Sequence, residues 1–149
     1  MAEGSNCIFC EIAAGRAPAS VVYEDERVIA FMDLFPITKG HLLVVPKEHY
    51  RNAFDCPPDV VAYLAQVGTR LAGPLRRATG CEGMNFHIAN EAVAGQDVWH
   101  IHLHLLPRYT GDGFGFRRAP GSGGRASRQI LDEMAGRIVA EVAADEEES

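Results

Sequence analysis

Three histidines stand at alternate positions in the segment between Trp99 and Arg108, and each is followed by an aliphatic residue. The run reads His100-Ile101-His102-Leu103-His104-Leu105. Only six histidines occur in 149 residues, so half of them gather here. Alternation at period two is typical of a β-strand, so the imidazoles should project from one face and the aliphatic side chains from the other. Each imidazole has two polar nitrogens that need partners, so packing alone does not explain the row. A solvated strand that happens to be rich in histidine is the alternative to a functional site.

The spacing of the three rings favours different tasks for them. Residues two apart on a strand lie roughly 6.6 Å apart, which puts His100 and His104 roughly 13 Å from each other. One reacting atom cannot contact both outer rings, so the central His102 is the natural reacting group. A neutral imidazole is a competent nucleophile toward phosphorus when an acceptor fixes its other nitrogen. The chain has neither a G-x-S-x-G nor a Ser-x-x-Lys nucleophile motif.

Composition limits the class of protein. A chain of 149 residues can bury the core of one domain, and we expect a single domain over residues 1–149. The net charge of −6 argues against nucleic acid as a partner. No long apolar run predicts a membrane span or a signal peptide. Four cysteines then indicate a reducing compartment, where metal ligation is more common than disulfides. We expect a cytoplasmic protein without a membrane partner.

Apolar patterns predict five strands and two helices. Strands are expected over residues 21–24, 28–33, 42–46 and 84–89, in addition to the histidine segment. A helix should begin at Pro57 and end at Gly80. A second helix is expected over about 126–143, with Leu131, Met134, Ile138 and Val142 on one face. Residues 145–149 should form an acidic tail, solvated or disordered. The order predicts an α+β fold, an antiparallel meander sheet of about five strands with the two helices on one face.

Three blocks of the sequence resemble one family. The blocks are Gly95-Gln96-Asp97-Val98-Trp99-His100-Ile101-His102-Leu103-His104-Leu105-Leu106-Pro107-Arg108, Phe31-Met32-Asp33-Leu34-Phe35-Pro36 with Gly40 to His49, and Cys7-Ile8-Phe9-Cys10-Glu11-Ile12. They resemble the histidine-triad (HIT) family of nucleotide hydrolases and transferases, in the bacterial form with an N-terminal Cys-x-x-Cys. The resemblance implies a HIT-like fold with its core over about residues 7–116, and a homodimer.

The resemblance also implies an activity. It suggests a nucleotidyl hydrolase that cleaves at the α-phosphate of purine nucleotide derivatives, such as nucleoside phosphoramidates, aminoacyl-adenylates or dinucleoside polyphosphates. In that scheme His102 forms a nucleotidyl-histidine intermediate, His104 donates to a phosphate oxygen, and Gln96 completes the catalytic set. The implied substrate-binding residues are Asp33, Leu34, Asn90, Gly95, Gln96, Asp97, Val98 and His104, with Ile12 near the base.

The Cys7-x-x-Cys10 pair is ambiguous by itself, because the same spacing serves redox sites and zinc sites. Two thiolates need two further ligands for a closed tetrahedral zinc site. The resemblance to zinc-bearing HIT proteins suggests His49 and His100, which would make the zinc structural and tie the N-terminal segment to the histidine strand. Free thiols are the alternative.

Some positions stay open at this level. Asp97 stands where several HIT branches have Ser or Thr, and an ionised carboxylate cannot protonate a leaving group, so the leaving group is undetermined. His41 follows Gly40, and the sequence does not decide whether it lines the site. The other functions to consider are a zinc-binding interaction protein, whose histidines hold the metal directly, and a nucleotidyltransferase of the same family.

Overall fold

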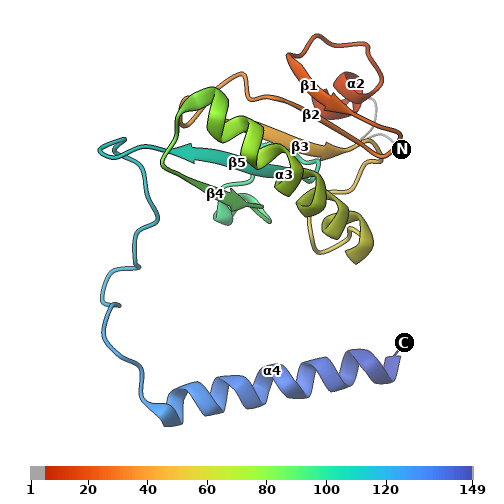
Figure 1. Ribbon diagram of the computed structural model, residues 1–149. Coiled ribbons are helices and arrows are strands. Elements are labelled where there is room, and N and C mark those ends of the chain that lie inside the picture. Colours follow the sequence, from red (N-terminus) through yellow and green to blue (C-terminus); the bar gives the residue numbers. More distant parts are fainter. Residues whose placement is uncertain (1–5, 149) are drawn as a thin grey trace. The chain divides into compact units, whose positions relative to one another are not determined.

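The computed structural model describes residues 6–148, and the chain divides into two compact units, one through Phe114 and one from Gly115. The first unit holds eight elements (Figure 1). They are α2 (Ile8–Ala13), β1 (Val21–Glu24), β2 (Val28–Met32), β3 (Leu42–Pro46), α3 (Pro58–Thr79), β4 (Gly83–His87), the 3₁₀ turn η1 (Ala92–Ala94) and β5 (Leu103–Arg108). The second unit holds α4 (Arg128–Glu148).

The five strands form one antiparallel sheet in the order β1-β2-β3-β5-β4. The predicted α+β fold is therefore confirmed. The order departs from a plain meander at one point, because β5 lies between β3 and β4. The chain leaves β3, runs through α3 to the edge strand β4, and returns to the middle of the sheet. This return places the histidine segment beside β3, at the centre of the sheet.

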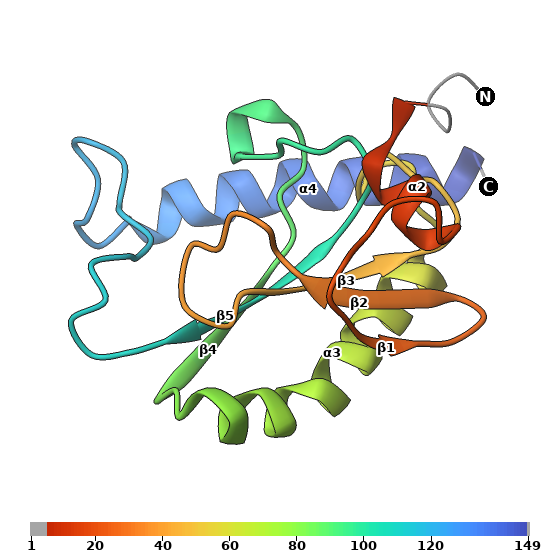
Figure 2. The ribbon, with the colours of Figure 1, turned by 90° about the horizontal axis from the view of Figure 1, so that it is seen from above.

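Helices cover both faces of the sheet, because α2, which the sequence does not predict, lies on the face opposite α3. Alternate residues of β2 and β3 pack with Leu64 and Val67 of α3, whereas the residues between them pack with Phe9 and Ile12 of α2. Both strands are buried along nearly their whole length, as the continuous apolar runs require. Figures 1 and 2 show α3 lying along β3, β5 and β4. The six-residue α2 is too short for a periodic apolar pattern, and no helix is predicted there.

The approach of α3 to the sheet is closest at Gly68. A Cβ atom at this position would lie 3.0 Å from Cδ2 of Leu103 and 3.3 Å from Cδ1 of Leu105. Glycine therefore lets the helix backbone come close to β5. The helix ends where the sequence predicts, at Gly80, which takes a left-handed conformation with φ of 71°.

The histidine segment is only partly a strand. β5 begins at Leu103, so His100 and His102 precede it. The backbone N–H of Ile101 donates to the carbonyl of Tyr50, 2.8 Å away, instead of joining the ladder with β3. The predicted alternation nevertheless holds, because Ile101, Leu103 and Leu105 lie in the core under α3. The rings of His100 and His102 contact Phe9 of α2 on the other face.

The second unit differs from expectation at its end. α4 continues through residues 145–148, which were expected to form a tail. Alanine and glutamate favour the helix, so these acidic residues extend it while staying exposed. Ser149 lies outside the described residues. Within residues 6–148, no helix is both long and apolar enough to cross a membrane.

Candidate active site and candidate metal centre

His102 lies at the centre of the site in one defined tautomer. Its Nδ1 is 2.7 Å from the carbonyl oxygen of His100, which can only accept, so Nδ1 carries the proton. The lone pair is then on Nε2. The side chain is only 4 % exposed, and burial lowers the pKa of His102, against the opposing charges of Asp97 and Asp33. A neutral ring with a free Nε2 lone pair is the form of histidine that can attack phosphorus.

His104 is fixed in the opposite tautomer through His41. The N–H of Ile37 donates to Nδ1 of His41 at 3.1 Å, so a neutral His41 carries its proton on Nε2. That nitrogen lies 2.8 Å from Nδ1 of His104, which must accept. His104 therefore carries its proton on Nε2. Burial, followed by the neighbouring rings of His102 and His87, lowers the pKa of His104 to about 3. His104 is thus a neutral donor.

Asp33 lies beside this pair, just after β2. Its Oδ2 is 3.5 Å from Nε2 of His41, and its Oδ1 accepts from the N–H of Phe35 at 2.8 Å. The next residue, Leu34, is 83 % exposed, so its side chain is available for contact with a ligand. Ile12, in contrast, is buried in the core on the α2 face of the sheet.

Asp33, His41 and His104 place three potential metal-binding atoms within 4.8 Å of one another. The tautomers argue against a metal there. Because Nδ1 of His41 accepts a hydrogen bond from the N–H of Ile37, the Nε2 of a neutral His41 carries the proton and has no lone pair to offer a metal. Two hydrogen bonds instead form a relay, from the N–H of Ile37 to His41 and from His41 to His104, and this relay orients His104.

The loop before the histidines is held by Gln96, which is 4 % exposed. Its Oε1 accepts from the N–H of Glu91 at 2.9 Å and from Nδ2 of Asn52 at 3.1 Å. Its Nε2 donates to the carbonyls of Arg51 at 2.6 Å and Val98 at 3.0 Å. All four hydrogen-bonding positions of the side chain are used inside the protein.

The other loop residues named from the sequence lie around Gln96. Gly95 has a φ of 100°, a conformation that favours glycine, and closes the turn after η1. Asp97 is exposed and Val98 is half-buried. Asn90 accepts a hydrogen bond on its Oδ1 from the N–H of Ala53, at 2.8 Å.

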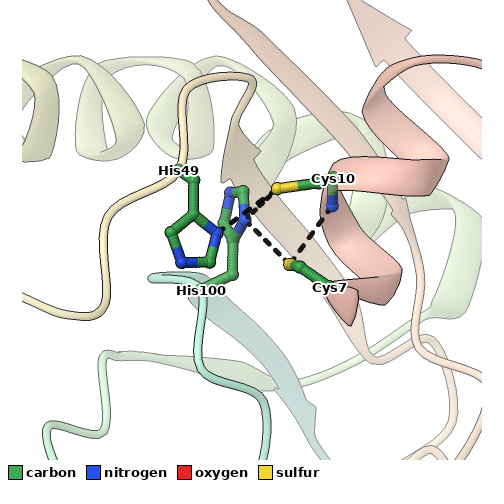
Figure 3. Close-up of side chains that lie close together, drawn as sticks. All are labelled: Cys7, Cys10, His49 and His100. Atoms are coloured by element: carbon green, nitrogen blue, oxygen red, sulfur yellow. Dashed lines mark hydrogen bonds between the residues drawn. The ribbon is translucent and has the colours of Figure 1, made fainter. Parts of the chain in front are cut away.

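Cys7, Cys10, His49 and His100 converge on one point (Figure 3). One potential ligand atom from each lies within 4.8 Å of all the others. Nδ1 of His100 is 3.3 Å from Sγ of Cys7 and 3.5 Å from Sγ of Cys10, while Nδ1 of His49 is 3.3 Å from Sγ of Cys10. In a tetrahedral zinc site, sulfur and nitrogen ligands are separated by about 3.6 Å, given their usual bond lengths. The four residues fit such a site.

Neighbouring groups orient the His100 ring and affect the ionisation of Cys10 in this cluster. Nε2 of His100 lies 2.8 Å from the carbonyl of Pro46 and so donates to it, which leaves Nδ1 to face the sulfurs. Burial and the neighbouring Cys7 raise the pKa of the Cys10 thiol to about 11. Because its pKa is raised, this thiol needs a cation beside it to become a thiolate at neutral pH.

Sequence reasoning left the role of His41 open and missed the partners of Gln96. His41 directly precedes the apolar run of β3, and this position in the sequence was a signal that the ring is buried. In the structure His41 is 1 % exposed. Arg51, Asn52 and Glu91 gave no local signal, because they meet across about forty residues of chain.

Known proteins resemble this chain in sequence and in fold. A HIT domain model matches residues 14–111. The chain belongs to the HIT family. An uncharacterized HIT-like protein, MJ0866 of Methanocaldococcus jannaschii, is 47 % identical over 107 residues, which cover 72 % of this chain and 82 % of that protein. Adenylylsulfatase HINT3 of Arabidopsis thaliana is 36 % identical over 70 % of this chain and 53 % of its own length.

Solved structures of HIT proteins share the fold. SMU.412c from Streptococcus mutans superposes with a TM-score of 0.86 at 42 % identity, covering 92 % of this chain and 85 % of its own. A Zn-bound histidine triad protein from Mycobacterium smegmatis has a TM-score of 0.71 at 38 % identity, covering 95 % of this chain and 99 % of its own.

Proposed function

We propose that this HIT protein is a nucleotidyl hydrolase acting at the α-phosphate of purine nucleotide derivatives. The observation that carries the proposal is the pair of opposite tautomers at His102 and His104. Within one cluster of rings, 4.6 Å between centroids, one ring offers a lone pair and the next offers a proton. That combination suits attack on a phosphorus whose oxygens gain negative charge. The family membership and the HINT3 relative support a nucleotide substrate.

The reaction has two steps. Nε2 of His102 forms a bond to the α-phosphorus while the bond from phosphorus to the leaving group breaks, and the leaving group takes up a proton from solvent. Water then attacks the same phosphorus and gives a proton back to solvent, the nitrogen–phosphorus bond breaks, and the nucleoside monophosphate departs. Nε2–H of His104 donates to a non-bridging phosphate oxygen, and this hydrogen bond strengthens as charge develops.

The remaining residues bind the nucleotide. Asp33 would accept from the ribose hydroxyls, Leu34 would contact the base, and Asn90 would contribute a further polar contact. The backbone of Gly95, Asp97 and Val98 would face the phosphate. Because the Gln96 side chain is fully occupied inside the protein, we assign it to holding this loop and not to touching the substrate.

Zinc would be held by Cys7, Cys10, His49 and His100. This assignment is supported by the convergent ligand atoms and by the Zn-bound relative from Mycobacterium smegmatis. When bound, the ion would neutralise the two thiolates and fix α2 against the segment that carries His100. The hydrolysis itself uses only His102 and His104.

We also propose a cytoplasmic homodimer. None of the four cysteines, all within the described residues, forms a disulfide, which supports a reducing compartment. The apolar side chains exposed along α4 support association with a second copy of the chain.

Adenosine 5′-phosphoramidate tests the activity. The parent protein should release AMP and ammonia, and His102→Ala should reduce kcat by about 10³-fold or more, as the loss of a nucleophile usually does. Mass spectrometry of the quenched parent should find one adenylyl group on the peptide that contains His102. Thermal unfolding of both proteins controls for folding. Equal turnover by the folded variant would show that His102 is not the nucleophile.

A further inference from the structure

Glu91 has an unusual backbone conformation directly before η1, the turn that leads into the loop 95–98 proposed to face the substrate phosphate. Among residues 6–148 it is the one residue other than glycine with a positive φ, at 79°, together with a ψ of 159°. Residues with a Cβ atom rarely adopt this region, so the conformation is strained. Strain of this kind persists only where surrounding contacts enforce it, and such positions concentrate at functional sites.

Both the side chain and the backbone of Glu91 make contacts that enforce this conformation. The Glu91 carboxylate accepts from Nε and Nη2 of Arg51, at 2.9 and 2.8 Å, and from Nδ2 of Asn52, at 2.7 Å. The Arg51 and Asn52 contacts lower the pKa of Glu91 to about 2, so the carboxylate is charged at neutral pH. On the backbone, its N–H donates to Oε1 of Gln96 and its carbonyl accepts from the N–H of Gln96 at 3.2 Å.

These bonds close a clamp of four residues, Arg51, Asn52, Glu91 and Gln96. It joins the segment just after His49 to the loop just before His100. Asn52 is 1 % exposed, and its Nδ2 donates to the side chains of both Glu91 and Gln96. The Glu91 carboxylate and the Gln96 amide therefore share one buried donor. Beyond the clamp, within residues 6–148, the N–H groups of Asp97 and Val98 donate to no protein acceptor.

We propose that Glu91 is a positioning residue, whose clamped and strained backbone holds the Asp97 and Val98 amides in place for a substrate phosphate. The inference rests on the function proposed above, in which this loop faces the phosphate. A relaxed Glu91 would rotate its N–H and carbonyl away from Gln96 and release the loop. Hydrogen-bond donors aimed in advance at an anion avoid the cost of ordering them when it binds. The strain of Glu91 is then part of the binding site.

Two substitutions separate positioning from general stability. Glu91→Gly permits the same φ without strain but removes the carboxylate, while Glu91→Gln keeps the shape and one acceptor and removes the charge. Glu91→Gly should raise the Kd for AMP and lower kcat/KM for adenosine 5′-phosphoramidate by about tenfold or more, since small misplacement of contacts is costly. Glu91→Gln should lie between this variant and the parent. Hydrogen exchange at residues 95–98 of the ligand-free protein should accelerate in the same order.

Glu82→Gln is the matched control. Glu82 is an exposed glutamate that also accepts two hydrogen bonds, from the N–H and Oγ1 of Thr110, each at 2.8 Å, but it lies outside the site. It should bind AMP and turn over like the parent. The inference is overturned if Glu91→Gly binds AMP with the parental Kd, or if it only lowers Tm while folded protein keeps parental kcat/KM. A parent protein that neither binds AMP nor hydrolyses the phosphoramidate would instead overturn the proposed function itself.

Discussion

At the scale of single residues, the same side chain performs different tasks because one neighbour fixes each tautomer. The carbonyl of His100 leaves the lone pair of His102 free, the carbonyl of Pro46 turns Nδ1 of His100 toward sulfur, and His41 makes His104 a donor. Two of these partners are backbone carbonyls, and the third, His41, is distant in sequence from His104. A motif can thus identify the histidines, but only the fold sets their protonation.

The role of His41 can be tested with two variants that each keep one of its two hydrogen bonds. In His41→Gln the side-chain amide can still donate to Nδ1 of His104, whereas in His41→Asn an oxygen can accept from Ile37 but nothing reaches His104. We expect His41→Asn to lower kcat about tenfold or more, as loss of an orienting partner commonly does, and His41→Gln to lower it less. Steady-state kinetics with adenosine 5′-phosphoramidate would measure both. The relay is refuted if the asparagine variant is the more active one.

At the scale of elements, the sequence predicted those that have a long or simple pattern. The apolar period of α3, its stop at Gly80 and the continuous runs of β2 and β3 are local signals, and the structure confirms them. The placement of β5 between β3 and β4 depends on pairing between distant segments, which no local pattern encodes. Likewise the start of β5 at Leu103 follows from the hydrogen bond between the N–H of Ile101 and the carbonyl of Tyr50, which is distant in the chain.

The short helix α2 depends on contacts outside itself for its stability, and the Cys7 and Cys10 cluster is one candidate for such a contact. Six residues are too few for a helix to be stable by itself in water. Two side chains of α2, Phe9 and Ile12, are buried against the sheet, and the Phe9 ring lies edge-on to His102 at 5.1 Å. A zinc ion on Cys7 and Cys10 would fasten α2 at its first turn and thereby keep the ring of Phe9 over His102.

Cys10→Ser should therefore remove both the metal and part of the stability. We expect about one zinc ion per chain in the parent and a small fraction of that in the variant, because serine is a poor zinc ligand. The Tm should fall, and a chelator should lower the Tm of the parent but not that of the variant. Elemental analysis and thermal unfolding measure these effects, with Cys81→Ser as the control, since Cys81 is a free buried thiol outside the cluster. Equal zinc content in Cys10→Ser would remove Cys10 from the ligand set.

At the scale of the whole molecule, the second unit, Gly115–Ser149, does not itself bury the apolar residues of α4. The face predicted from the sequence is present, but Leu131, Met134, Ile138 and Val142 are each 43–56 % exposed. The charges of the helix also oppose its dipole, with Arg128 in the first turn and three glutamates in the last. A helix with an exposed apolar stripe and unfavourable end charges gains stability from a partner surface. In the proposed homodimer, a second copy of the chain would supply it.

Ile138→Glu tests this use of α4. A charge in the middle of a buried apolar stripe leaves an unpaired carboxylate in the interface, so the dimer Kd should rise about tenfold or more. Gln129→Glu adds the same charge on α4 at a position away from the four stripe residues and should leave the Kd nearly unchanged. Sedimentation velocity over a range of concentrations would give both constants, and circular dichroism would check that the helix content is retained. If Ile138→Glu dimerises as tightly as the parent, the homodimer forms through another surface and the apolar face of α4 requires a different partner.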